Sequence, residues 1–277
     1  CKLTKVFVDN DPVTVHMDPN CIEQAITERT SAILAVHCYG IPCDHDDISA
    51  IAAKNGLKII YDAAHAFGVT EKGSSVLKWG DVSVTSFHAT KVFNTFEGGA
   101  AFSRKSDLRT ALSRARNFGF EAEDRINHIG LNGKMSELNA AVGLVQLRHV
   151  SNYIARRRQV HARYSETLAP IKGVRIIAPA EQEGHNFAYF PVILDENCTV
   201  TRDDLSSRLL QHGIQTRRYF LPLLPDFKVF TNPSRMSGEP PNASKLANQI
   251  RCLPMHAELN KDEITHVCNT LRRLLWA

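Results

Sequence analysis

The sequence predicts an α/β protein with a mainly parallel sheet in a large domain, followed by a smaller α+β region. Over the first hundred residues, short apolar runs alternate with helical patterns. Two of these runs, Ile33-Leu34-Ala35-Val36 and Ile59-Ile60-Tyr61, are apolar almost throughout, which is typical of strands covered on both faces. After Pro170 the pattern changes to separate strands and helices. A strand–helix–strand arrangement with right-handed crossovers is therefore expected in the first part.

The elements of the first part follow from these runs. Strands are expected at 5–8, 32–37, 58–61, 82–87 and 100–103. A helix is expected over 46–55, because Ile48, Ile51 and Ala52 share one face and Gly56 follows as a stop signal.

A long helix is expected from Met135 to about Leu168, since apolar residues such as Leu138, Val142 and Val145 recur at helical spacing. Ser136 and the Glu after it are a plausible start. The basic run 156–158 lies on this helix and is interpreted as a solvated face rather than a nucleic-acid site.

The remaining chain is predicted to contain a strand at 187–194, a helix at 202–212, an irregular Pro-rich stretch at 222–241 and a final helix at 262–275. The predicted domains are residues 1–150, a large α/β domain, and residues 151–277, the end of the linking helix and a small α+β domain.

Composition excludes several classes of protein. The 277 residues carry a net charge of only +4, with Lys and Arg spread along the chain, so nucleic acid is not expected as the partner. No apolar run is long enough to span a bilayer, and the start at Cys1-Lys2 does not resemble a signal peptide. The seven cysteines show no pairing pattern and are interpreted as reduced thiols. A cytoplasmic protein without a membrane partner is expected.

The candidate site lies where two predicted strands end. Asp62 ends one apolar strand and His65 follows it, while Ser86, His88 and Lys91 follow another. In an open parallel sheet the loops after the carboxyl ends of strands form the ligand crevice, so these side chains should converge.

Three chemistries fit such a group. A Ser-His-Asp hydrolase would use Ser86 with Asp62 and one histidine, but no G-x-S-x-G motif surrounds the serine. The segment 37–45 contains two His and two Cys, yet no second ligand pair completes a zinc site, so no metal is expected. Pyridoxal 5'-phosphate requires a Lys for a Schiff base and an acid opposite the pyridine nitrogen, and Lys91 and Asp62 fit those roles.

The motifs also resemble a known family. The run Ser-Phe-His-Ala-Thr-Lys-Val-Phe-Asn-Thr-Phe-Glu-Gly-Gly-Ala (86–100) is similar to the DegT/DnrJ/StrS sugar aminotransferases, a branch of the aspartate-aminotransferase fold. It looks most like enzymes that aminate dTDP-linked 3-keto- or 4-keto-6-deoxyhexoses. Further matching segments lie at 6–9, 37–42, 62–68, 130–141, 218–222 and 253–255.

The resemblance implies a role for each matching residue. Lys91 would form the Schiff base and then move the proton between the substrate carbon and the cofactor. Asp62 would pair with the pyridinium nitrogen, His65 would lie near the 3-hydroxyl, and Ser86 would hold the phosphate.

Other implied contacts involve the substrate and a second subunit. Asn132, with Lys134 beside it, would come from the neighbouring subunit of a homodimer with shared active sites. His88, Lys134 and Tyr219 would contact the substrate. The implied reaction is transamination of a nucleotide-linked keto-sugar, with glutamate or a similar amino acid as donor, in amino-sugar biosynthesis.

One departure concerns the start of the chain. The sequence opens without Met in an apolar run, and the family's Gly-Thr or Gly-Ser phosphate loop would lie upstream of Val6. We therefore expect that residues are missing upstream. Two alternatives stay open: a sugar dehydratase of the same family, against which Lys91 argues because those relatives carry His there, and a non-catalytic remnant or dimerisation module.

Overall fold

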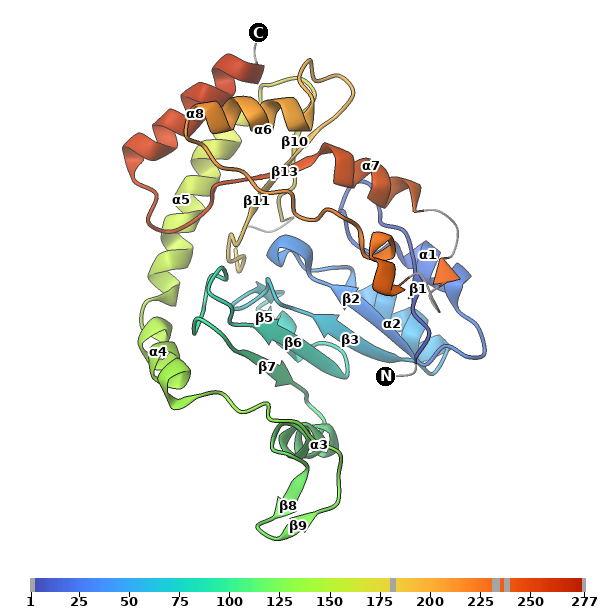
Figure 1. The fold of residues 1–277 in the computed structure, drawn as a ribbon. Helices are drawn as coiled ribbons and strands as arrows, with labels where there is room; N and C mark the ends of the chain where they lie inside the picture. The colour runs from blue at the N-terminus through green and yellow to red at the C-terminus, as the bar shows by residue number, and fades with distance from the viewer. Residues whose placement is uncertain (1–2, 180–182, 231–234, 237–239, 276–277) are drawn as a thin grey trace.

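The computed structural model describes residues 3–179, 183–230, 235–236 and 240–275 (Figure 1). Its central sheet has four strands in the order β2-β3-β6-β7. These strands are β2 (Ala32–Val36), β3 (Lys58–Asp62), β6 (Val82–Ser86) and β7 (Gly99–Phe102). The first three run parallel and β7 is antiparallel to β6. The predicted α/β class with a mainly parallel sheet is confirmed.

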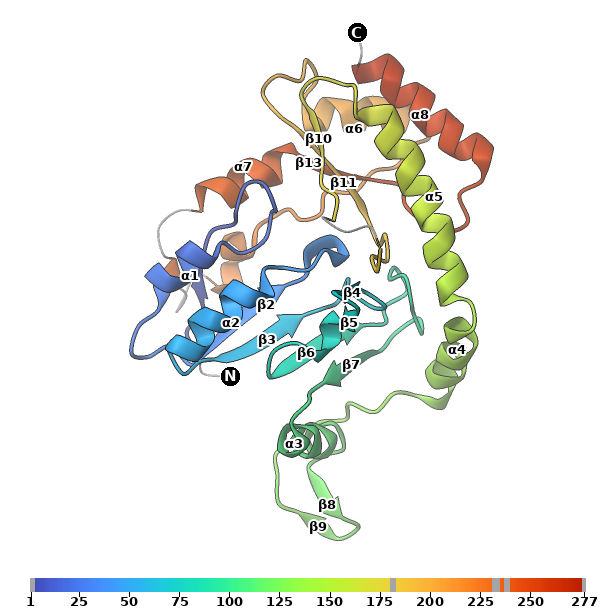
Figure 2. The same ribbon diagram turned by 180° about the vertical axis from the view of Figure 1, so that it is seen from behind.

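One face of the central sheet carries the core of this region. Helix α2 (His45–Lys54) begins after the N-cap Asp44, and its buried Ile48 packs in one cluster with Ile33 and Ile59 of the strands. Figure 2 shows α2 in front of the sheet, with α1 (Pro19–Ala25) beside it at the left. The helix predicted at 46–55 is therefore present.

The other face of the sheet differs from the expectation. Burial alternates along the strands, and Leu34 and Val84 are 55% and 44% exposed. The prediction that these strands are covered on both faces is wrong for the described chain, because helix α2 lies on one side and Leu34 and Val84 point away from the buried cluster.

The long helix predicted over 135–168 is two helices, α4 (Glu137–Leu147) and α5 (Val150–Leu168). The start is as predicted, since Ser136 caps α4 by accepting a hydrogen bond from the Asn139 N–H. The break occurs where the N–H groups of Arg148 and His149 bond to carbonyls only three residues back. Such bonds tighten the chain into a turn and end the regular α-helical ladder.

A second sheet, β10-β11-β13, forms the C-terminal part with helices α5, α6 and α8. Its strands are β10 (Val174–Ile176), β11 (Phe190–Leu194) and β13 (Ile250–Leu253), and its other helices are α6 (Arg202–Gln211) and α8 (Lys261–Leu275). A cluster that includes Tyr164, Phe190 and Leu271 fills the space between sheet and helices. Both helices predicted here are present.

The strand predicted at 187–194 begins later, at Phe190. Phe187 has a positive φ of 50°, and its N–H bonds to the His185 ring, while the Ala188 N–H bonds to the Asn186 side chain. Because side chains bind these backbone groups, the segment cannot join the ladder until Phe190.

Several smaller elements complete the chain. The strand predicted at 5–8 is β1 (Val6–Phe7), and it pairs with β12 (Arg235–Met236) instead of joining the central sheet. Helix α3 (Ser106–Arg116) and the hairpin β8 (Phe120–Ala122) and β9 (Arg125–Ile126) project from the body (Figure 1).

The remaining short elements are β4 (Thr70–Glu71), β5 (Ser74–Ser75), α7 (Pro241–Gln249) and the single-turn helices at 38–40, 76–78, 224–226 and 228–230. The stretch predicted as irregular at 222–241 contains the last two of these turns, while its residues 231–234 and 237–239 lie outside the described residues, as do Cys1 and Lys2. Within the part of the chain that is described, no helix is long and apolar enough to cross a membrane.

Candidate active site

The carboxyl ends of β3 and β6 bring three of the expected residues to one edge of the sheet. Asp62 is the last residue of β3 and pairs in register with Val84 of β6, which ends two residues later at Ser86. The following loop turns back on itself, because the Lys91 N–H bonds to the His88 carbonyl at 2.9 Å. The Lys91 amine lies near this edge, since the charge of Asp62 acts on it.

Asp62 has one oxygen engaged and one available. Its Oδ1 accepts a hydrogen bond from the Ala64 N–H at 2.9 Å, which fixes the carboxylate on its own loop. Among the described residues no donor reaches Oδ2. A carboxylate held in this way can pair with a cationic group of a ligand.

Lys91 is half-buried, and its amine donates a hydrogen bond to the Tyr189 hydroxyl at 3.3 Å. Burial lowers the pKa of the Lys91 amine below its ordinary value, and the negative charge of Asp62 partly opposes that shift. A lysine with a lowered pKa is more often a free amine, which is the nucleophilic form.

His65 is a neutral imidazole. Only 8% of the residue is exposed, and burial, assisted by the charge of Lys91, lowers its pKa to about 3. Its Nδ1 accepts a hydrogen bond from the Tyr39 N–H at 3.1 Å, which assigns the ring proton to Nε2. The ring stacks on Phe220 with centroids 5.5 Å apart.

Ser86 and His88 are linked at the start of the loop. The Ser86 hydroxyl accepts a hydrogen bond from the His88 N–H at 3.2 Å. The His88 ring is exposed, bonds to Thr90, and lies 3.8 Å from a carboxylate oxygen of Glu97. The His88 ring therefore lies on the surface, at the start of the loop that follows β6.

Tyr219 belongs to a group of contacting rings, Tyr189, Tyr219 and Phe220, which we call the aromatic wall. Lys91 contacts this wall through the Tyr189 hydroxyl. The Tyr219 carbonyl accepts a hydrogen bond from the Tyr39 hydroxyl, and the Tyr219 ring meets that of Tyr189 edge-on at 5.5 Å. The structure thus places Tyr219 next to the residue that Lys91 contacts.

Asn132 and Lys134 lie elsewhere. Asn132 is exposed and forms an isolated β-bridge with Asn117, and the amine of Lys134 lies 5.0 Å from the ring centroid of Phe118. Both belong to the projecting region with α3, and within the described residues neither contacts Asp62, Ser86 or Lys91. One chain alone does not bring them to the site.

Within the segment 37–45, His37 and Cys43 are buried. His37 stacks on Tyr61 at 4.8 Å, and its Nδ1 lies 3.3 Å from the Cys43 sulfur. Burial raises the pKa of Cys43 to about 12 and lowers that of His37 to about 3, so thiol and imidazole are both neutral. In the described ranges no group of three or more His, Cys, Asp or Glu is placed to hold a metal.

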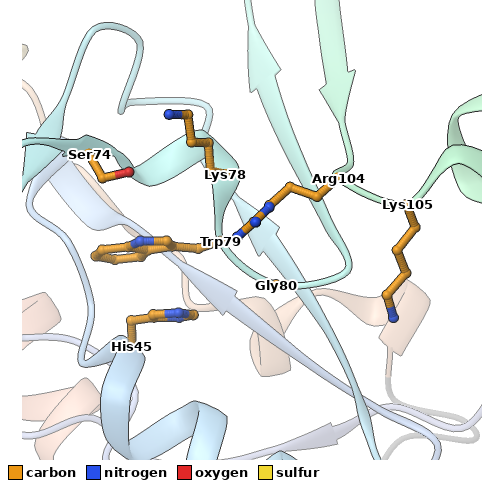
Figure 3. Close-up of a pocket in the computed structure, with 7 residues that line it drawn as sticks. All are labelled: His45, Ser74, Lys78, Trp79, Gly80, Arg104 and Lys105. Atoms are coloured by element: carbon orange, nitrogen blue, oxygen red, sulfur yellow. The ribbon is translucent and has the colours of Figure 1, made fainter.

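A cavity of about 520 Å³ lies beside the start of α2, and none of Asp62, Ser86 and Lys91 lines it (Figure 3). In it the Trp79 ring stacks on His45 with centroids 4.4 Å apart. The cavity is lined by His45, Ser74, Lys78, Trp79, Gly80, Arg104 and Lys105. None of the residues expected at the site belongs to it.

Sequence reasoning missed the residues that join the two sheets at the site. Tyr189 was hidden inside a predicted strand, and Asn186 had no motif to mark it. Gly40 offered a signal, since it adopts φ of +83° and a Cβ there would lie 2.7 Å from the Asn186 side chain and 2.8 Å from the His65 carbonyl. A glycine required by close backbone approach marks a junction.

Comparison with known proteins gives consistent matches. The DegT/DnrJ/EryC1/StrS aminotransferase family matches residues 1–272. The dTDP-4-amino-4,6-dideoxy-D-glucose transaminase of Shigella dysenteriae is 47% identical over 98% of this chain and 74% of its own length, and that of Escherichia coli is 38% identical over 97% and 73%. A crystal structure of DesI in the presence of its TDP-sugar product superposes with a TM-score of 0.90, at 37% identity, over 98% of this chain and 69% of that one.

Proposed function

This chain belongs to the DegT/DnrJ/EryC1/StrS aminotransferase family, and we propose that it aminates a nucleotide-linked keto-sugar with pyridoxal 5'-phosphate carried by Lys91. Transamination of a nucleotide sugar is the activity of its named relatives, and the resemblance extends over nearly the whole chain. The observation that carries the residue assignment is that Asp62 ends β3 beside the end of β6, close enough for its charge to raise the pKa of the half-buried Lys91 amine.

The residues at this edge fit the cofactor. Pyridoxal phosphate, when bound, supplies a ring that accepts the electrons released when a substrate C–H bond breaks. It needs an amine, an acid for the ring nitrogen and donors for the phosphate. Lys91 provides the amine, the free Oδ2 of Asp62 the acid, and the Ser86 hydroxyl a phosphate donor.

Each side chain then has a defined task. Asp62 keeps a proton on the ring nitrogen, because an adjacent carboxylate favours the charged form of its partner. His65 is neutral, and its Nε2–H would be available to the 3-hydroxyl of the cofactor. The lowered pKa of Lys91 favours its free amine, which would accept a proton from the substrate carbon and deliver it to the cofactor.

We place the cofactor-binding domain at residues 1–150 and the small domain at 151–277. The central sheet lies wholly within the first range and the β10-β11-β13 sheet wholly within the second. The aromatic wall with Tyr219 then comes from the small domain and, together with His88, would face the sugar.

The acceptor ketone is proposed at C4 of a 6-deoxyhexose linked to dTDP. Both curated relatives described above are named for a 4-amino-4,6-dideoxy-D-glucose on dTDP. An amino group introduced at C4 by transamination replaces a ketone at C4. Glutamate is proposed as the donor.

The active unit is proposed to be a homodimer in which Asn132 and Lys134 reach the partner's site. Helix α4 supports this, because it exposes Leu138 by 71% and carries Leu144 and Val145 largely exposed as well. Exposed apolar side chains gathered on one helix mark an interaction surface. In a two-fold dimer the exchange is reciprocal, so both sites would be completed.

The test is a transamination assay with ¹⁵N-glutamate and a dTDP-4-keto-6-deoxyhexose, read by mass spectrometry. The expected product is a dTDP-amino-sugar that carries the label, and the same assay with a GDP-linked keto-sugar should give a weaker signal. Labelled product from the GDP sugar alone would replace the proposed nucleotide. Absence of labelled product from both would overturn the proposed activity.

A further inference from the structure

The contact between Lys91 and Tyr189 joins the two sheets of the molecule. Among the described residues, the Tyr189 hydroxyl is the hydrogen-bond partner of the Lys91 amine, at 3.3 Å. Lys91 follows β6 of the central sheet, and Tyr189 directly precedes β11 of the C-terminal sheet. We propose that Tyr189 is a positioning residue that holds the Lys91 amine whenever the amine is not bonded to the cofactor. The proposal rests on Lys91 as the cofactor lysine.

A phenol suits this task better than a carboxylate would. Burial raises the pKa of Tyr189 well above its ordinary value, so the hydroxyl stays protonated and uncharged. It can accept an N–H from the ammonium form of Lys91 and donate its own O–H to the free amine. A carboxylate would instead stabilise the ammonium form and oppose its conversion to the free amine.

The Tyr189 ring is fixed on several sides. It lies 4.7 Å from the His65 ring, 5.9 Å from Tyr39 and 5.5 Å from Tyr219, measured between centroids. The contacts with Tyr39 and Tyr219 are edge-to-face and the one with His65 is tilted, and together they restrict the orientation of the ring. The hydroxyl is therefore presented at one place relative to His65, which itself belongs to the proposed site.

The backbone before Tyr189 is fixed as well. The Asn186 side chain is fully buried and donates hydrogen bonds to the carbonyls of His65 at 2.8 Å and Phe67 at 2.9 Å. From the other side, Arg157 of α5 donates to the Ala188 carbonyl at 3.2 Å. Asn186 thus ties the Tyr189 segment to the loop that follows Asp62.

This anchoring matters because a lysine side chain is flexible. Its four-carbon stem has many rotamers, and ordering such a side chain costs about 2 kcal/mol in conformational entropy. The amine must leave the cofactor and return to it in every turnover. A fixed partner on the opposite wall keeps the free amine near the reacting carbon, which raises its effective concentration there.

The first test uses protein without cofactor, so it reads the contact itself. The rate at which acetic anhydride modifies Lys91, followed by peptide mass spectrometry over a range of pH, gives the pKa of its amine. Tyr189→Phe removes one oxygen and keeps the ring. Both forms of the amine lose a hydrogen bond, but the bond from the charged ammonium is the stronger one, so the pKa should fall by roughly half a unit to one unit. An unchanged Lys91 titration overturns the proposal.

The matched control is Tyr164→Phe. Tyr164 is fully buried in the C-terminal core, whereas Tyr189 is partly buried. Among the described residues the Tyr164 hydroxyl has no hydrogen-bond partner. Its loss should leave both the Lys91 titration and turnover unchanged. Equal thermal unfolding of the two variants would show that the ring replacement itself is tolerated.

The second test measures turnover with cofactor bound. Tyr189→Phe should lower kcat about tenfold, the effect of one lost hydrogen bond to a charged group, with the KM of both substrates nearly unchanged. A rise in KM without loss of kcat would assign Tyr189 to substrate binding and overturn the positioning role. If borohydride instead fixes the cofactor on another lysine, the proposed function of Lys91 fails while the titration of the Lys91–Tyr189 contact stays readable.

Discussion

Sequence motifs marked two regions of the molecule, the sheet edge at Asp62 and Lys91 and the projecting region around Asn132. In the structure, only the sheet edge gathers its marked residues within one chain. At the edge, parallel strands in register place the ends of β3 and β6, and so Asp62 and Ser86, side by side, and the loop after β6 carries Lys91 within range of the Asp62 charge. Asn132 and Lys134 are exposed on the projecting region. The strands of one chain are enough to position the residues of the sheet edge. Asn132 and Lys134, by contrast, could contribute to an active site only if that site belongs to another chain.

The largest expected effect comes from Lys91→Ala, which removes the cofactor's attachment and the proton carrier together. Turnover should fall at least about 10³-fold. Lys91→Arg should be equally inactive, because it keeps the charge without a nucleophilic amine. Lys78→Ala, which alters a lysine of the cavity in Figure 3, should leave turnover unchanged. Ordinary turnover in Lys91→Ala would remove the sheet edge from the chemistry.

Asp62→Asn should have the next largest effect. The amide retains the shape of the side chain but cannot hold a proton on the ring nitrogen, so turnover should fall by about 10² to 10³. The cofactor should still attach, which its absorbance would report. A variant within a few-fold of the original enzyme would mean that another acid serves the ring.

A mixing experiment addresses the second region. Lys91→Ala and Asn132→Ala should each be poorly active, but in mixed dimers one of the two sites contains neither change. Unfolding and refolding the two together should restore about a quarter of normal activity, since half of random dimers are mixed.

The mixing experiment has its own control on α4. Adding Leu138→Glu to both chains should abolish recovery, while Leu210→Glu, an equally exposed leucine on α6, should not. Failure to recover any activity in the mixture without these changes would place Asn132 outside the partner's site.

The smallest effect concerns the neutral histidine at the sheet edge. The unfolded chain protonates His65 below about pH 6.5, whereas the folded chain does so only near pH 3. Stability should therefore be lost as the pH falls from about 6.5 towards 3. In cofactor-free protein, His65→Gln should lose less stability between pH 7 and 5 than the original chain, by about 2 kcal/mol at most.

Urea unfolding at the two pH values measures this difference. Exposed His149 provides the comparison, and His149→Gln should lose as much stability as the original chain. The same loss in all three proteins would mean that His65 is not the buried neutral imidazole described above.

The sequence was most informative where local chemistry determines structure. The apolar runs of β2 and β3 and the residues that follow them predicted the sheet and placed Asp62, Ser86 and Lys91 at its edge. The break at Arg148–His149 carries no Gly or Pro, so periodicity alone could not reveal it.

Tyr189 could not be predicted for a different reason. Its contact with Lys91 spans 98 positions and depends on how the C-terminal sheet meets the central one through Asn186. Contacts of this kind depend on packing between elements that no local pattern encodes.

The most direct test of the account is to treat the protein with pyridoxal phosphate and borohydride, digest it, and locate the modified lysine by mass spectrometry. The account predicts the cofactor on the peptide that contains Lys91, with no modification there in Lys91→Arg. Cofactor fixed on a different lysine, with Lys91 unmodified, would contradict it.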